Sequence, residues 1–266
     1  MQTIHHKRNE LLEVGFYKDK ECTEDFDFTN AKNLYIQPVN GELTPLFYLN
    51  THLVNKDLRI NNLMIPHIAN DENILYDIDD ILKMRVNKIY TLGNDAVSSL
   101  ELVCIIVNAV SNLSKYIPKD NAVLFLSEEG ADKYADDCEA WFLYQKDFPK
   151  RELNSEMDIR DWKKLTIFLP HGTQSELQKA NEVAKELKEK YGVEEVNLFA
   201  LHCFSRYIDA SNVQYTADLG FINQWSINKI ITTNSTGILP VQDNERLQVI
   251  DAKEIFEEYL KNSKII

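Results

Sequence analysis

Apolar and polar positions in the second half of the chain follow two different periods. A mainly apolar run at residues 165–169 predicts a buried strand, and a short loop with Gly172 and Thr173 follows. The next segment, which ends near Gly192, predicts an amphipathic helix because its apolar residues recur at the helical period. These apolar residues are Leu177, Ala180, Val183, Ala184, Leu187 and Tyr191. A second apolar run at 196–201 predicts another strand, so the loop lies where parallel-sheet proteins hold phosphates.

Similar alternation extends over the rest of the chain. Strands are predicted at residues 34–38, 46–49, 88–92, 122–126, 140–144 and 229–233. Helices are predicted at residues 71–84, at about 97–113 and at 254–260. Strands that alternate with helices indicate an α/β protein with a mostly parallel sheet covered by helices. The segment 111–120, with Pro118 near its end, is the expected domain boundary.

Composition narrows the class of protein. The chain has 266 residues, of which 44% are hydrophobic, and this content is typical of a globular protein. Its 42 acidic and 29 basic residues give a net charge of −13, and no basic run is present, so nucleic-acid binding is not expected. No apolar stretch approaches the roughly 20 residues of a membrane span, and the N-terminus does not read as a signal peptide.

The cysteines and the N-terminal histidines offer no metal site. Cys22, Cys104, Cys138 and Cys203 show no C-x-x-C spacing, so neither zinc nor a disulfide framework is expected. The adjacent pair of histidines at 5 and 6 is interpreted as solvated. A reducing, cytoplasmic location follows as an expectation.

Five segments, in order along the chain, resemble motifs of one family. They are residues 39–43 (VNGEL), 69–82 (ANDENI with IDDIL), 122–135 (AVLFLSEEGADKYA), 198–205 (LFALHCFS) and 230–235 (IITTNS). The family is ribose-phosphate pyrophosphokinase, or PRPP synthetase, in which similar segments read DGE, NSDDIM with VDAL, VVVAPDAGAVKRA, YATHGLFS and VVTDT/TTNS. The resemblance implies two phosphoribosyltransferase-like domains, at 1–116 and 117–266, each with a mainly parallel sheet flanked by helices.

The chain departs from the family where ATP binds. PRPP synthetases transfer a pyrophosphoryl group from Mg-ATP to ribose 5-phosphate, so the resemblance implies Mg²⁺ and ATP as cofactors if that activity is retained. Two family segments that hold Mg-ATP, FPYARQDR and DPHS, have no counterpart. Residues 90–92 run directly into 93–110, which resemble a later helix of the family, and 114–122 are too few for the second segment.

The ribose-phosphate loop departs as well. In the family two aspartates that bind ribose hydroxyls follow the strand, and a DTGGT loop then wraps the 5-phosphate. Phe168 and Leu169 stand at the aspartate positions and cannot accept hydrogen bonds from a sugar. The residues at and beside the phosphate cradle are His171, Gly172, Thr173, Gln174, Ser175 and Glu176. Glu176 would repel a phosphate, and Thr173-x-x-Glu176 predicts a capping box that uses the same donors.

Basic side chains form the remaining catalytic candidates. The resemblance puts Lys146 at the place of the family's catalytic-loop lysine, and Lys150 and Arg151 follow closely. They could neutralise phosphate charge, but a solvated loop of mixed charge is the favoured interpretation. His171 is either a ligand contact or a hydrogen-bonded loop histidine.

Two further groups are interpreted structurally. His202 and Cys203 are disfavoured as a base and nucleophile pair, because neighbours along a strand point to opposite faces. The acidic cluster at Glu128, Glu129 and Asp132 is expected to mark a helix start rather than a Mg²⁺ site.

Three hypotheses about function follow. The favoured one is a diverged, non-catalytic relative that binds a partner subunit or a phosphorylated metabolite such as a sugar or a nucleotide. The alternative is an active ribose-phosphate diphosphokinase or phosphoribosyltransferase in nucleotide or NAD precursor synthesis. A pure assembly module is the third, and a homo-oligomer or a complex with a related subunit is expected.

Overall fold

The computed structural model describes the following residues: 1–8, 14–37, 46–66, 85–92, 104–107, 122–125, 142–144, 163–172, 174–203, 205–209, 212–216, 225–236 and 245–265. The chain divides into two compact units. Unit 1 consists of Met1–Val107, Ser235–Ile238 and Ala252–Ile266, and unit 2 consists of Asn108–Asn234 and Leu239–Asp251. The expected boundary near Tyr116 lies outside the described residues. The expected C-terminal domain, residues 117–266, does not coincide with unit 2, because the last segment of the chain, Ala252–Ile266, belongs to unit 1.

Unit 1 is built on a mainly parallel sheet. Its described strands run in the order β2-β1-β3-β4-β5-β6. They are β1 (Gln2–Arg8), β2 (Val14–Tyr17), β3 (Asn33–Ile36), β4 (Ile60–Met64), β5 (Val86–Leu92) and β6 (Cys104–Val107). β1 and β2 pair antiparallel, and every other neighbouring pair is parallel.

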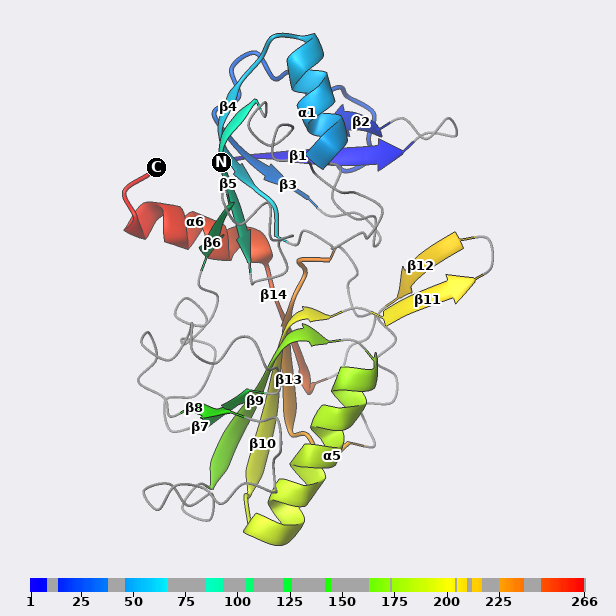
Figure 1. Cartoon of the computed structure of the whole chain (residues 1–266), viewed down its shortest axis with the longest axis vertical. Helices are drawn as coiled ribbons and strands as arrows, with labels where there is room; N and C mark the ends of the chain where they lie inside the picture. The colour runs from blue at the N-terminus through cyan, green and yellow to red at the C-terminus, as the bar shows by residue number, and fades with distance from the viewer. Residues whose placement is uncertain are drawn as a thin grey trace. The chain divides into compact units, whose positions relative to one another are not determined.

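A helix packs on each face of this sheet (Figure 1). Helix α1 (Leu46–Asn55) buries Leu49 and Leu53 in a core that also contains Ile4, Leu34 and Ile89. Tyr35 and Tyr90 are the strand neighbours of Leu34 and Ile89, so they point to the opposite face. There their rings lie 6.1 and 6.0 Å from those of Phe256 and Tyr259 of α6 (Ala252–Asn262). The apolar face of α6 therefore explains why the end of the chain belongs to unit 1.

Two predicted elements of unit 1 were wrong in type. Residues 46–49 were expected to be a strand but begin α1, because Leu49 and Leu53 lie one turn apart and share its buried face. Residues 104–107, inside the helix expected at about 97–113, form β6. The run CIIV contains two β-branched isoleucines and a valine, which favour a strand. The rest of that segment and the helix expected at 71–84 lie outside the described residues.

Unit 2 contains a second sheet, whose described strands are all parallel. Their order is β14-β13-β10-β9-β7-β8. They are β7 (Ala122–Phe125), β8 (Phe142–Tyr144), β9 (Lys164–Gly172), β10 (Glu195–Cys203), β13 (Lys229–Thr233) and β14 (Leu247–Ile250). β11 (Ser205–Asp209) and β12 (Asn212–Thr216) form a separate antiparallel hairpin. The prediction of two mainly parallel sheets, and hence of an α/β fold, is confirmed.

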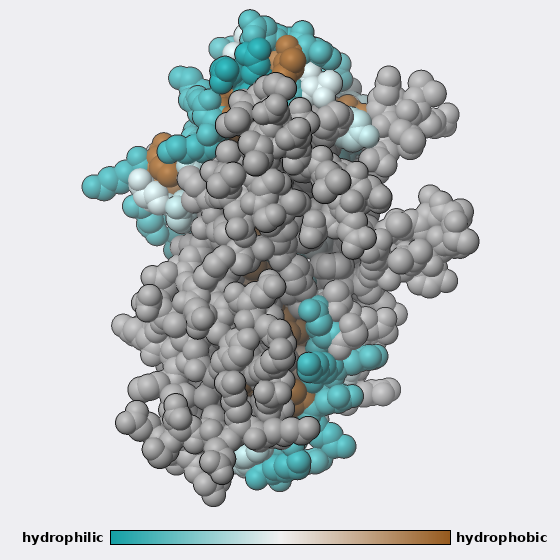
Figure 2. Space-filling view, in the orientation of Figure 1, coloured by the Kyte–Doolittle hydropathy of each residue, from teal (hydrophilic) through white to brown (hydrophobic). Residues whose placement is uncertain are grey.

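The predicted strand–helix–strand unit is also confirmed. β9 and β10 pair side by side, and the helix between them is α5 (Gln174–Tyr191). Its apolar face packs on one face of the sheet, and the residues over its outer side are hydrophilic (Figure 2). Gly192 has a φ of 73°, and the backbone N–H of Val193 donates to the Leu187 carbonyl oxygen at 3.2 Å. Glycine therefore ends α5 as expected.

Candidate functional site

The candidate site lies at the carboxyl edge of the second sheet. β9 ends at Gly172, β10 at Cys203 and β13 at Thr233, all parallel. Ligands of α/β proteins bind outside the carboxyl ends of parallel strands, where a following helix presents its N-terminus. Because α5 begins at Gln174, its N-terminus follows this edge directly.

β9 is longer than the sequence pattern indicated. His171 and Gly172 were expected in a loop, but they lie in β9 and pair with His202 and Cys203 of β10. The register omits Pro170, which has no N–H to donate, and resumes beyond it. The ladder with β10 therefore extends the strand through residues that would otherwise begin a ligand-binding loop.

The two positions at which the resemblance predicted the family's aspartates are buried on opposite faces of the sheet. Phe168 is 1% exposed, and its ring stacks on that of Phe199, with centroids 5.5 Å apart and planes at 10°. Leu169 is 3% exposed and belongs to the core beneath α5, together with Leu177 and Ala200. Neither position offers a group to a ligand at the edge of the sheet.

The first turn of α5 carries the rest of the predicted loop. Gln174 and Ser175 are its first two residues, and Glu176 is the third and partly exposed. That position is the one a capping box requires of Glu176 if Thr173 is the N-cap. Thr173 lies outside the described residues, so the capping box stays a prediction.

Polar residues at the ends of β10, β13 and β14 are largely engaged with protein groups. His202 is fully buried, and the Thr233 hydroxyl donates to the Leu201 carbonyl oxygen at 2.6 Å. The Asn234 side chain donates to an Asp251 carboxylate oxygen at 3.1 Å. The sequence signal for these contacts is the polar run TTNST, which begins in the last two residues of β13 and continues beyond it.

Several predicted site residues cannot be placed at this edge. Lys146, Lys150 and Arg151 lie outside the described residues, as does the acidic cluster at 128–132. Their roles stay predictions. Among the residues that the structure does describe, no group of three or more His, Cys, Asp or Glu side chains is arranged to hold a metal ion.

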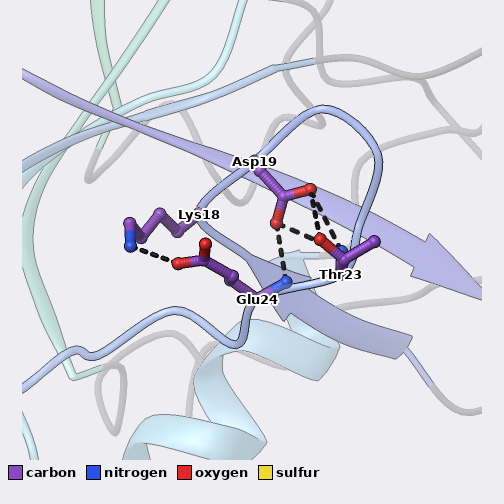
Figure 3. A network of polar contacts seen from close by, with 4 residues as sticks. All are labelled: Lys18, Asp19, Thr23 and Glu24. Carbon is purple, nitrogen blue, oxygen red and sulfur yellow. Dashed lines mark hydrogen bonds and ion pairs between the residues drawn. The ribbon is translucent and has the colours of Figure 1, made fainter.

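A separate polar network lies in the loop after β2 (Figure 3). The Asp19 carboxylate accepts hydrogen bonds from the backbone N–H groups of Glu24, at 2.7 Å, and Thr23, at 3.1 Å. These bonds hold the pKa of Asp19 below its ordinary value, and the ion pair with Glu24 raises the pKa of Lys18. Since these groups bind one another, the network fixes the shape of the loop.

Comparison with known proteins supports the fold and does not identify a family or an activity. No family model matches the chain, and no curated protein sequence matches it. Among solved structures, the chain is similar to phosphoribosylpyrophosphate synthetase from Mycobacterium smegmatis, with a TM-score of 0.54 and 14% identity over 97% of this chain and 90% of that chain. At this identity the likeness shows the fold alone: a mixed α/β protein with two mainly parallel sheets that resembles a PRPP synthetase.

None of the helices in the described parts of the chain is long and apolar enough to cross a membrane.

Proposed function

We propose that this protein is a diverged relative of PRPP synthetase that does not form PRPP and acts by binding. The single observation behind this proposal is the course of β9. The strand continues through the positions of the family's ribose-binding aspartates and ends three residues later. Phe168 and Leu169 occupy those positions and are both buried.

The chemistry of the family reaction supports the same conclusion. Pyrophosphoryl transfer depends on groups that are already positioned to hold two polyanionic reactants and to stabilise the charge that develops between them. Removing such groups typically lowers the rate by orders of magnitude. Here the sugar-binding carboxylates are replaced by apolar side chains, and the sequence lacks both segments that hold Mg-ATP in the family.

Two kinds of ligand are compatible with a binding role, and a protein partner is the better supported. A phosphorylated sugar or nucleotide would need the N-terminal donors of α5, yet the first turn of that helix carries Glu176. A carboxylate there repels a phosphate. We therefore propose a second copy of this chain or a related subunit as the main partner, with a phosphorylated metabolite as the alternative.

Calorimetric titration with PRPP and with ribose 5-phosphate tests the state of the loop. Wild type should bind neither compound tightly. Glu176→Ala should keep the fold, at a cost of about 1 kcal/mol or less, and should bind phosphate more strongly than wild type because the repulsion is removed. Glu182→Ala, which removes an exposed carboxylate from the middle of the same helix, is the matched control and should change nothing.

The opposite result would be informative. Tight binding of PRPP by wild type that Glu176→Ala abolishes would make Glu176 a working ligand-binding group, and the degenerate-site interpretation would be wrong.

Sedimentation over a range of protein concentrations tests self-association separately. A mass that stays at that of one chain throughout would rule out a second copy as the partner.

A further inference from the structure

The chain passes between its two units at the ends of two neighbouring strands, β13 and β14. The chain passes from one unit to the other after Val107, Asn234, Ile238 and Asp251. Two of these crossings directly follow β13 and β14, which are adjacent parallel strands paired from Ile230↔Leu247 to Thr233↔Ile250. Two connections therefore leave unit 2 side by side.

Hydrogen bonds continue between the two strands up to the crossings themselves. The backbone N–H of Asn234 donates to the Ile250 carbonyl oxygen at 3.1 Å. Its side-chain amide donates to an Asp251 carboxylate oxygen, also at 3.1 Å. The last residue of unit 2 on one connection is thus bound to the last residue of unit 2 on the other.

The residues that directly follow the two crossings are buried. Ser235 is 1% exposed and Thr236 is 8% exposed, while Ala252, the first residue of α6, is fully buried. Before the first crossing, the Thr233 hydroxyl ties β13 to the Leu201 carbonyl oxygen of β10. Asn234 and Asp251 are consequently the last residues of unit 2 on these two connections, and they are joined by a side-chain hydrogen bond.

We propose that Asn234 and Asp251 form a clamp that makes these two connections move as one. Two separate connections can bend and twist independently, whereas two connections that are joined at the same level can deform only together. The clamp uses the amide of Asn234 as donor and a side-chain oxygen at 251 as acceptor. Breaking it should therefore loosen the end of β13 and the beginning of α6 at the same time.

Hydrogen exchange of the full-length chain, followed by mass spectrometry, tests the clamp. Asn234→Ala should speed exchange several-fold both in the segment 232–236 and in the segment 250–255, although the substitution lies only in the first. Asp251→Ala should do the same. Asp251→Asn should resemble wild type, because an amide oxygen still accepts the hydrogen bond from Asn234.

A local control separates the clamp from ordinary loosening of α6. Lys253→Ala breaks the partly buried pair between Lys253 and Glu257, whose charged atoms lie 4.0 Å apart in the same helix, and should leave exchange in 232–236 unchanged. If Asn234→Ala speeds exchange only around its own position, or in neither segment, the clamp does not exist. If Asn234→Ala fails to fold, the comparison of Asp251→Asn with Asp251→Ala decides: equal exchange in 232–236 would overturn the proposal.

Discussion

Two adjacent residues, Phe168 and Leu169, carry the proposal for the candidate site. Phe168 and Leu169 point to opposite faces of one sheet, and each completes a core. A ribose-binding carboxylate at either position would have to be buried or would have to break the strand. Apolar side chains at 168 and 169 and the continuation of β9 through Gly172 therefore support each other.

Restoring an aspartate should damage the protein. Phe168→Asp buries an unpaired carboxylate and removes the ring that stacks on Phe199, so the free energy of unfolding should fall by about 3–5 kcal/mol. Urea unfolding followed by circular dichroism measures this loss. Val249→Asp makes the same kind of change at an exposed position of β14 and should have a small effect. Equal stability of Phe168→Asp and wild type would show that position 168 can open toward a ligand.

His52 should make unit 1 sensitive to mild acid. Its ring lies 5.8 Å from that of Phe16 and 5.0 Å from that of Phe28, and burial lowers its pKa below the ordinary value of 6.5. Lys56 lowers this pKa further, and Asp25 opposes the shift. The unfolded chain therefore binds more protons than the folded one just below pH 6.5, so stability is full above that pH and falls as the pH is lowered through this range.

Thermal unfolding at neutral and mildly acidic pH checks the sign. His52→Phe keeps an aromatic ring in the cluster but cannot take up a proton, so its transition temperature should fall less on acidification than that of wild type. Part of the fall should persist, because burial lowers the pKa of His5 too. The interpretation of His5 and His6 as a solvated pair was wrong, since both lie in β1 and His6 is buried. Identical acid sensitivity of the two proteins would show that His52 contributes nothing.

At the scale of elements, the sequence predicted best where a pattern was long. α5 carries six apolar positions at helical spacing and a glycine stop, so both its type and its end were correct. A short apolar run does not distinguish a strand from a helix, and α1 and β6 were therefore wrong in type. β1 and β4 were missed because polar residues interrupt them, as in QTIHHKR and INNLM. The short strands β2, β11, β12 and β14 were missed as well.

Helix α6 should be essential to unit 1 although it comes last in the chain. It buries Ala252, Ile255, Phe256 and Leu260. A chain that ends at Asp251 would expose the rings of Tyr35 and Tyr90, so unit 1 should lose its cooperative unfolding or unfold at a clearly lower temperature. Calorimetry of this truncated chain measures the effect.

The matched control ends at Asn262 and removes only the tail beyond α6. It should unfold close to wild type. If the chain that ends at Asp251 also unfolds like wild type, α6 is not part of the folding unit formed by the N-terminal residues.

At the scale of the whole molecule, the sequence predicted the architecture, whereas the two compact units divide the chain differently from the expected domains. Alternating strands and helices indicated two mainly parallel sheets. Helix α6 belongs to unit 1 because it packs on the sheet face that carries Tyr35 and Tyr90. The apolar pattern of α6 predicts a helix but does not indicate which sheet the helix packs on. The candidate site was predicted only in part. The sequence shows Phe168 and Leu169 where the resemblance predicts aspartates. The continuation of β9 could not be predicted, because it depends on pairing between His171 and His202 of β10, which lies 31 residues further along the chain.

The central claim is that this fold, similar to that of a PRPP synthetase, lacks the machinery to form PRPP. The direct test incubates the purified chain with ATP, ribose 5-phosphate and Mg²⁺ and measures release of AMP, with the Mycobacterium smegmatis enzyme as a positive control. We expect no AMP above background under conditions in which the control reacts fully. Release of AMP that requires both ribose 5-phosphate and Mg²⁺ would contradict the account.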